Sequence, residues 1–166
     1  MKEIRNKREF VENLTSDGRL KEPLTLAQGC VLYGLTSVTS LEGLTLAQGC
    51  VLYDLTSVTS LEGLTLAQGC ELQGIDSLRE IPVVEVTASE AEILGKIPVE
   101  NVVMTSWHCG TTHCLAGSAQ YQAGDMSADP RSEGKRLLPS VSHLFFAPTE
   151  PVRQWLKEKR WTVAQS

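Results

Sequence analysis

The sequence has no long hydrophobic run and no segment typical of export. None of its 166 residues falls in a stretch approaching the roughly 18 apolar residues that cross a bilayer. Residues 1–14 mix charges of both signs and lack the apolar core of a secretory signal. We therefore expect a cytoplasmic location in a host cell, where the five cysteines are reduced thiols rather than disulfides.

Basic residues are missing from residues 23–78, which contain neither Lys nor Arg. This absence disfavours nucleic-acid binding by that stretch, because phosphate contacts require Lys and Arg. The 15 acids outside it balance the 15 bases of the chain, so five acids inside it account for the net charge of −5. These acids suit a basic partner, or simple solubility. They are Glu42, Asp54, Glu62, Glu71 and Asp76.

A unit of 20 residues is written twice in succession. LTLAQGCVLYGLTSVTSLEG occupies residues 24–43 and recurs at residues 44–63 with one change, Asp54 at the position of Gly34. A third copy begins at Leu64, keeps LTLAQGC and then diverges. A fixed period predicts a solenoid, in which each unit buries its apolar face by stacking on its neighbours. Short alternating runs broken by glycines favour parallel β-strands over a leucine-rich-repeat horseshoe, whose LxxLxL run is missing.

Stacking with this period places equivalent residues in ladders about 4.8 Å apart. Cys30, Cys50 and Cys70 form one ladder, which we interpret as small buried filler rather than a metal site. Tyr33 over Tyr53 forms another. The third copy departs from the repeat at Glu71, Gln73 and Asp76, as expected of a terminal coil that meets a different neighbour.

The flanking segments have helical patterns. Residues 1–13 predict a short helix that covers the open end of the solenoid. Further helices are expected after Thr87, from Thr111 or Thr112 to Gly124, over residues 132–146 with a kink at Pro139, and after an N-cap at Thr149. The predicted fold class is α+β. It comprises an N-terminal helical cap (1–22), a short right-handed parallel β-solenoid of three to four 20-residue coils (23–85) and a C-terminal helical domain (86–166).

Residues 107–117, WHCGTTHCLAG, hold the densest group of chemically versatile side chains. His108, Cys109, His113 and Cys114 could supply metal ligands, although the C-x4-C spacing is loose and no second pair exists. Alternatively, Cys114 in a first helical turn could be a reactive thiol, with His113 or His143 as base. We favour a third, structural interpretation, in which the threonines cap a helix and the small residues pack. No catalytic residue, metal or cofactor is therefore expected.

The segments MTSWHCGTTHCLAG (104–117), RLLP (136–139) and HLFFA (143–147) together resemble a C-terminal helical region of uncharacterised bacterial and phage proteins. Those proteins carry 20-residue repeats of the form GLT-x4-DLxLxGTxITSLPE ahead of it, a rhythm matched by GLT at Gly43 and TSLEG at Thr59. The resemblance covers most of residues 24–160 and implies the architecture. It brings no established activity, and Ser118 stands where a Trp usually follows the Ala-Gly pair.

These observations favour a non-enzymatic protein-binding module. We expect its acidic solenoid face, together with Tyr33 and Tyr53, to engage a basic protein surface. A narrower hypothesis is a phage-associated inhibitor that blocks a nucleic-acid-binding cleft as a DNA mimic or anti-CRISPR-type protein does. The alternatives are a thiol- or metal-dependent enzyme centred on Cys109, His113 and Cys114, and self-association through the tyrosine face.

Overall fold

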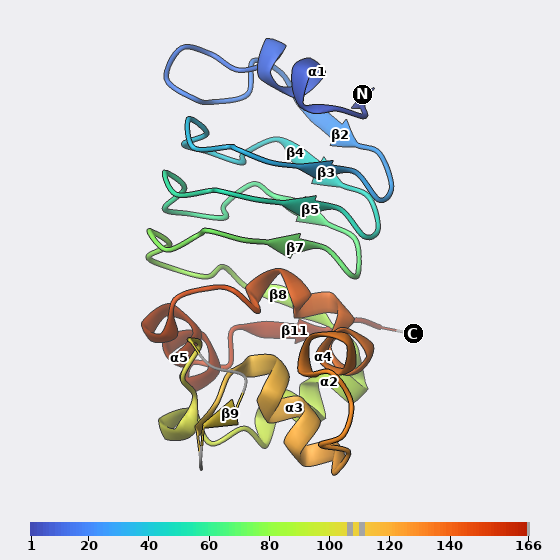
Figure 1. Ribbon diagram of the computed structural model, residues 1–166, viewed down its shortest axis with the longest axis vertical. Coiled ribbons are helices and arrows are strands. Elements are labelled where there is room, and N and C mark those ends of the chain that lie inside the picture. The colour runs from blue at the N-terminus through green and yellow to red at the C-terminus, as the bar shows by residue number, and fades with distance from the viewer. Residues whose placement is uncertain (106–107, 110–111, 166) are drawn as a thin grey trace.

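The computed structural model describes residues 1–105, 108–109 and 112–165. It combines helices with parallel sheets and contains a β-solenoid of about four turns (Figure 1). The coils form one half of the elongated molecule, and the segments after residue 86 form the other half (Figure 1). Among the described residues, no helix has the length and apolar content required to cross a membrane.

Two parallel sheets run along the solenoid. The first has the order β1-β2-β4-β6, with strands Lys2–Ile4, Leu24–Leu26, Leu44–Leu46 and Thr65–Leu66. The second has the order β3-β5-β7, with strands Val31–Leu32, Val51–Leu52 and Glu71–Leu72. Strand partners are 20 residues apart, as in Leu24 with Leu44 and Val31 with Val51. The predicted stacking of the repeats is confirmed.

The alternating leucines of the repeat fill the interior of the coils. Leu26 and Leu46 are fully buried, and so are Leu32 and Leu52 in the second sheet. The third side of each coil has no strand, yet its apolar residues also point inward. They are Leu35, Val38 and Leu41 in the first coil and Leu55, Val58 and Leu61 in the second. Each coil therefore buries three apolar edges against the next, which is how units too small to have a core of their own become stable.

The N-terminal segment differs from the predicted helix. Residues Lys2–Ile4 form β1, which pairs with β2 in parallel and extends the first sheet by one strand. Helix α1 spans only Lys7–Glu12, because the Asn6 side chain accepts a hydrogen bond from Glu9 N and caps it. Phe10 of α1 is fully buried against the coils. An open sheet edge exposes unpaired backbone groups, so a strand covers it better than a helix alone.

Gly18 gives the N-terminal loop its close approach to the first coil. Its φ is +84°, and a Cβ there would lie 2.1 Å from Ser37 O. Gly29 has a similar φ of +70°, but a Cβ there would meet nothing within 4 Å. Both Gly→Ala variants strain the left-handed backbone by about 1 kcal/mol. Urea denaturation should show that Gly18→Ala is less stable than Gly29→Ala by a further 1–3 kcal/mol or so, the usual range for overpacking. Equal losses would mean that the loop does not pack against the coil.

The described residues after the third coil form ten elements. They are β8 (Val84–Val86), α2 (Ala88–Gly95), the 3₁₀ helix η1 (Val99–Asn101), β9 (His108–Cys109), β10 (Thr112–His113), α3 (Leu115–Ala123), α4 (Pro130–Leu137), the 3₁₀ helix η2 (Pro139–Leu144), α5 (Thr149–Lys157) and β11 (Trp161–Val163). β9 and β10 are antiparallel, whereas β11 pairs with β8 in parallel. The last strand of the chain therefore joins the first strand that follows the third coil.

The helices predicted after residue 86 are present, but several of their boundaries differ. Thr149 is not the N-cap of the last helix: Pro148 is, and the Thr149 hydroxyl instead accepts a hydrogen bond from Met104 N. Thr87 caps α2 in a capping box with Glu90, as its sequence indicates. Helix α3 begins at Leu115, later than predicted, and its N-cap is Cys114 rather than Thr111 or Thr112; it ends at Gly124 as expected. The helix expected over residues 132–146 is two separate helices, α4 and η2. The break falls at Pro139, because its ring disfavours a helical conformation at the residue before it.

Candidate functional site

Four of the five predicted binding acids lie exposed on the coils. Glu42 and Glu62 occupy equivalent positions, whereas Asp54 and Asp76 lie at the other end of the strandless side. Residues 55–61 run between Asp54 and Glu62, so the four carboxylates border that side of the solenoid at both ends. None of the ion pairs found within the described part of the chain involves any of them. Their charge is available to a partner.

Asp54 adopts the conformation of the glycine that it replaces. Its φ is 65°, in the left-handed region that Asp tolerates better than most residues. One carboxylate oxygen accepts a hydrogen bond of 2.8 Å from Gly34 N in the coil above. The single difference between the two full repeats therefore adds a negative charge without changing the turn.

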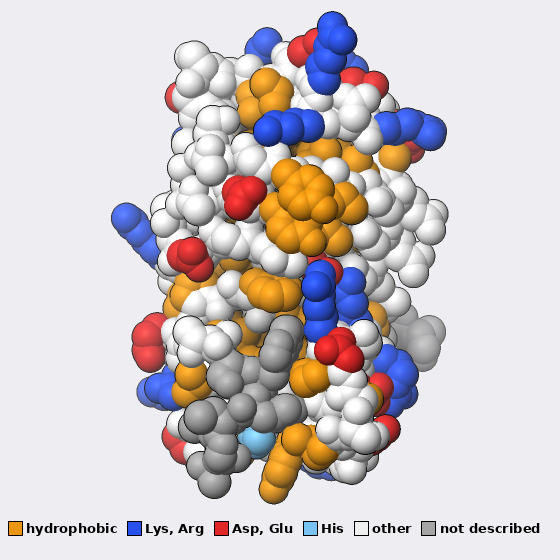
Figure 2. Space-filling model, viewed as in Figure 1, with side chains coloured by type: hydrophobic (Ala, Val, Ile, Leu, Met, Phe, Trp, Pro, Cys, Tyr) orange, Lys and Arg blue, Asp and Glu red, His pale blue; other side chains and the backbone are white. Residues whose placement is uncertain are grey.

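The predicted tyrosine ladder is confirmed. The rings of Tyr33 and Tyr53 stack with centroids 4.6 Å apart and an interplanar angle of 6°. Tyr33 is 60% exposed, and the neighbouring Val31 is exposed as well. Figure 2 shows this hydrophobic patch over β3 and β5, with acidic side chains on one side of it. An exposed pair of stacked aromatic rings is typical of protein-binding surfaces.

Glu71 does not belong to the exposed acidic face. It is 1% exposed, and its two carboxylate oxygens accept hydrogen bonds of 2.7 Å from Arg131 Nε and Nη2 of helix α4. Lys135 Nζ lies 2.9 Å from the same carboxylate. Burial raises the pKa of Glu71, but the hydrogen bonds from Arg131 and Lys135 outweigh it, so the pKa lies below its usual value.

This ion-pair cluster was missed because its bases lie 60 residues further along the chain. One sign of this contact is visible in the sequence: the third copy has Glu71 at the position where the second copy has Val51. Arg131 also lies over the Phe146 ring, 5.6 Å from its centroid. Glu71 thus holds the last coil to the C-terminal part through this ion-pair cluster. Figure 2 shows basic side chains next to the hydrophobic patch.

The cysteine ladder has a structural role. Each thiol donates a hydrogen bond to a backbone carbonyl of the preceding segment: Cys50 to Ala27 O at 3.1 Å and Cys70 to Ala47 O at 3.2 Å. Cys30 donates similarly to Arg5 O at 3.2 Å, and burial raises its pKa. The hydrogen bond between the Cys50 and Cys70 side chains lowers the pKa of Cys50 to about 7 and raises that of Cys70. The thiols of the ladder are thus paired with backbone carbonyls and with each other, as expected of buried packing residues.

The His/Cys cluster is only partly described. Cys114 is buried and caps α3, where its sulfur accepts a hydrogen bond of 3.3 Å from Gly117 N. Burial raises its pKa, which opposes the reactive-thiol hypothesis. His113 stacks on Tyr121 at 4.9 Å. The side chains of His108 and Cys109 lie outside the described residues, and within those residues no group of three or more potential metal ligands is assembled.

His143, the other candidate base, lies on η2 and lines a pocket between β6 and β8, which does not include Cys114. Burial lowers its pKa to about 4, so the imidazole is neutral at physiological pH. The structure therefore does not assemble the proposed thiol–imidazole pair from these two residues. A scan against protein-family models, a search of curated proteins and a search of solved structures found no match to the chain.

Proposed function

We propose that this protein is a non-enzymatic binding module that recognises a basic protein surface through its solenoid. The binding surface comprises Tyr33, Tyr53, Asp54 and Asp76, which we call the Tyr/Asp surface. The observation that carries the proposal is the stacked tyrosine pair, because Tyr33 is 60% exposed and yet held in a fixed orientation by Tyr53. Rigid aromatic rings offer a large contact area at a low entropic cost.

The chemistry of this surface fits arginine. A guanidinium group stacks on a tyrosine ring through a cation–π interaction and donates hydrogen bonds from its edge to a carboxylate. Asp54 directly follows Tyr53, so ring and carboxylate are adjacent. Glu42 and Glu62 lie at the far end of the strandless side and add a longer-range attraction for a basic partner.

The narrower hypothesis of a phage-associated inhibitor is one form of this proposal. A DNA mimic must approach the charge density of a duplex, about one charge per 1.7 Å. The coils repeat at about 4.8 Å, and the first two carry only Glu42 in one and Asp54 and Glu62 in the other. In an anti-CRISPR-like complex the tyrosines would therefore supply most of the affinity and the carboxylates mainly the orientation. Right-handed coiling, a capping segment at residues 1–22, a separate domain at residues 86–166 and a cytoplasmic location complete the proposal.

Affinity purification from host lysate with matched variants tests this proposal. We expect Tyr33→Ala and Asp54→Lys each to weaken capture of the partner at least tenfold, in line with hot-spot residues of about 2 kcal/mol. Glu22→Lys is the control, because it makes the same two-unit change of charge as Asp54→Lys at an exposed position outside the Tyr/Asp surface. The proposal is wrong if the partner binds both surface variants as well as it binds the control.

Light scattering distinguishes self-association through the same tyrosines. We expect the purified protein to stay monomeric as its concentration rises. If the protein is a dimer and the Tyr33→Ala substitution makes it monomeric, the Tyr/Asp surface instead mediates contacts between copies of this chain. Addition of duplex DNA separates the inhibitor form from other partners, because DNA should compete with the solenoid for a nucleic-acid-binding cleft but not for another basic surface.

A further inference from the structure

The 20-residue period continues one strand beyond the third copy, but the pairing does not. β8 (Val84–Val86) begins 20 residues after Leu64, where the solenoid pattern places the next strand of the first sheet. Instead of pairing with β6, it pairs with β11. β6 and β8 are therefore both edge strands, and within the described chain no ladder joins them. Edge strands carry backbone groups that can pair with another strand.

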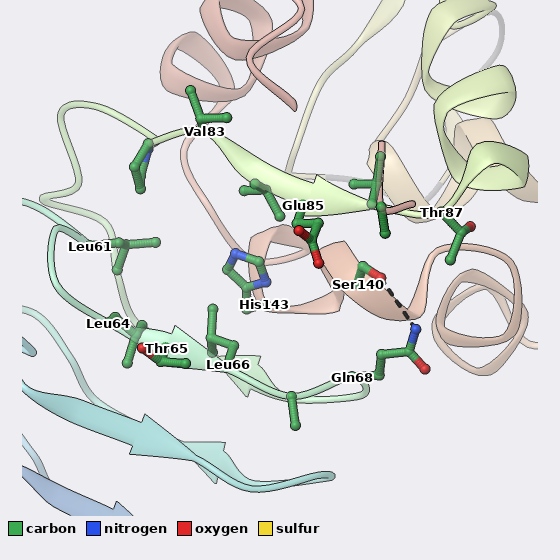
Figure 3. Close-up of a pocket in the computed structure, with 15 residues that line it drawn as sticks. Leu61, Leu64, Thr65, Leu66, Gln68, Val83, Glu85, Thr87, Ser140 and His143 are labelled. Atoms are coloured by element: carbon green, nitrogen blue, oxygen red, sulfur yellow. Dashed lines mark hydrogen bonds between the residues drawn. The ribbon is translucent and has the colours of Figure 1, made fainter. Parts of the chain in front are cut away.

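A pocket of about 490 Å³ separates the two edges (Figure 3). Its size is within the range of about 300–1,000 Å³ that is typical of ligand sites. Leu64 and Leu66 of the third coil line it and are partly exposed, although the equivalent leucines of the first two coils are fully buried. The opposite wall is formed by Val84 and Val86. In the first two coils the next coil covers these leucines, whereas in the third coil no further strand of the described chain covers them.

A buried polar side chain points into the pocket. Figure 3 shows the His143 ring between Leu66 of β6 and Glu85 of β8. His143 is 3% exposed, and in the part of the chain that is described its ring makes no hydrogen bond. A neutral imidazole has one donor and one acceptor, and among the described residues neither His143 nitrogen belongs to the fully buried side-chain atoms that lack a partner, so both remain open to the pocket. A ligand that enters the pocket can satisfy them.

We propose that this pocket binds an extended peptide segment of a partner protein, which adds a strand between β6 and β8. The segment has the pattern apolar–basic–apolar. Its outer two residues pack on the leucines of β6 and the valines of β8, and its backbone pairs with the two strand edges. Its polar backbone also reaches the His143 ring.

The preference for a basic middle residue follows from the register. Thr65 and Glu85 are the equivalent residues of β6 and β8, both exposed and both lining the pocket. Side chains alternate along a strand, so the middle residue of an added strand lies between these two and faces solvent. Glu85 is the only charged residue among the described residues that line the pocket, and an opposite charge on a neighbouring strand is favourable. This site is separate from the Tyr/Asp surface, none of whose four residues lines the pocket.

Three peptides test the proposal: acetyl-Gly-Leu-Lys-Leu-Ala-amide, the same peptide with Glu in place of Lys, and the Lys peptide with N-methylated leucines. NMR on the full chain follows the His143 ring and the backbone amides of β6 and β8. We expect saturable shifts with the Lys peptide, at least fivefold weaker binding of the Glu peptide, and no detectable binding of the methylated peptide, because its two leucine nitrogens face the same strand edge and can no longer donate to it.

Exchanging a surface charge provides the matched protein variant. Glu85→Lys should reverse the preference between the Lys and Glu peptides, whereas Glu22→Lys, at an exposed position that does not line the pocket, should leave it unchanged. Equal binding of all three peptides, or the absence of shifts at millimolar concentration, would overturn strand addition. Peptide binding should also survive Tyr33→Ala, since that residue belongs to the other surface.

Discussion

Glu71→Gln is expected to lower the free energy of unfolding by about 2–3 kcal/mol, because it breaks a buried ion pair at the junction of coil and helix. Glu71 is 1% exposed and bound by both Arg131 and Lys135. The neutral amide keeps the shape of the side chain but offers only one acceptor to two cations. The loss falls below the 3–5 kcal/mol or so of a fully buried pair, because the side chains of Arg131 and Lys135 are 40% and 32% exposed and can reach water.

The effect depends on pH with a definite sign. The pKa of Glu71 is lowered in the folded state, so the stability that its charge contributes is present above the unfolded pKa of about 4.3. It is lost as the pH falls through the lower, folded pKa. The difference between the wild type and Glu71→Gln should thus be constant from about pH 6 to 8 and shrink in acid below about pH 4.

Urea denaturation followed by circular dichroism measures both quantities. Glu92→Gln is the control, since it removes the exposed pair with Lys96, in which the two side chains are 70% and 64% exposed. Such surface pairs contribute about 0.5 kcal/mol or less. If Glu71→Gln were no more destabilising than this control, Glu71 would not hold the solenoid to helix α4.

Deleting residues 44–63 should leave a folded protein that is only about 1–3 kcal/mol less stable, from the usual stability of roughly 0.05–0.15 kcal/mol per residue. The deletion joins Gly43 to Leu64, which reproduces a native junction. The N-terminal segment keeps the first coil and Glu71 keeps its bases. Cys70 then donates to Ala27 instead of the equivalent Ala47.

A single cavity should cost more than this whole coil. Leu46→Ala leaves a hole under a fully buried side chain, and such substitutions destabilise by about 2–5 kcal/mol. We therefore expect the urea midpoint of Leu46→Ala to lie below that of the deletion. The reverse order, or an unfolded deletion variant, would show that the coils are not interchangeable units. The deletion also removes Tyr53 and Asp54, so it should abolish partner binding.

The repeat could be predicted from sequence because its period acts through local stacking. Equivalent leucines, cysteines and tyrosines lie in register as expected, and the Thr87–Glu90 capping box sets the start of α2. These features depend on residues close in sequence or exactly one period apart. Their geometry follows from strand spacing and helix capping alone.

The availability of the acidic side chains was predicted less well, because an acid in a segment without bases can still pair with a base from a distant segment. Residues 23–78 lack bases, yet helix α4 supplies Arg131 and Lys135 to Glu71. Glu90 is a second acid with a distant partner, although that partner is uncharged. Its buried carboxylate accepts hydrogen bonds from Ser140 N at 2.9 Å and Ser140 Oγ at 2.8 Å. No local pattern encodes either contact, because both join segments 50 or more residues apart.

The edges of the solenoid were also beyond the sequence pattern. β1 was predicted as helix because Lys2–Ile4 is a short, mixed segment, and its pairing with β2 becomes favourable only when that edge exists. The pocket beside β6 arises because β8 pairs with β11, which lies near the end of the chain. The repeat pattern predicts pairing of β8 with β6. Which edge β8 actually pairs with depends on side-chain packing at both edges, and the repeat contains no information about β11.

Photo-cross-linking in host lysate tests the central claim most directly. A photoreactive phenylalanine analogue is placed at position 33, on the Tyr/Asp surface, or at the control position 28, and the products are identified by mass spectrometry. The account predicts one dominant partner peptide containing Arg or Lys, captured from position 33 and not from position 28, and lost in Asp54→Lys. Capture of the partner from position 28 alone, or no product from position 33, would contradict it.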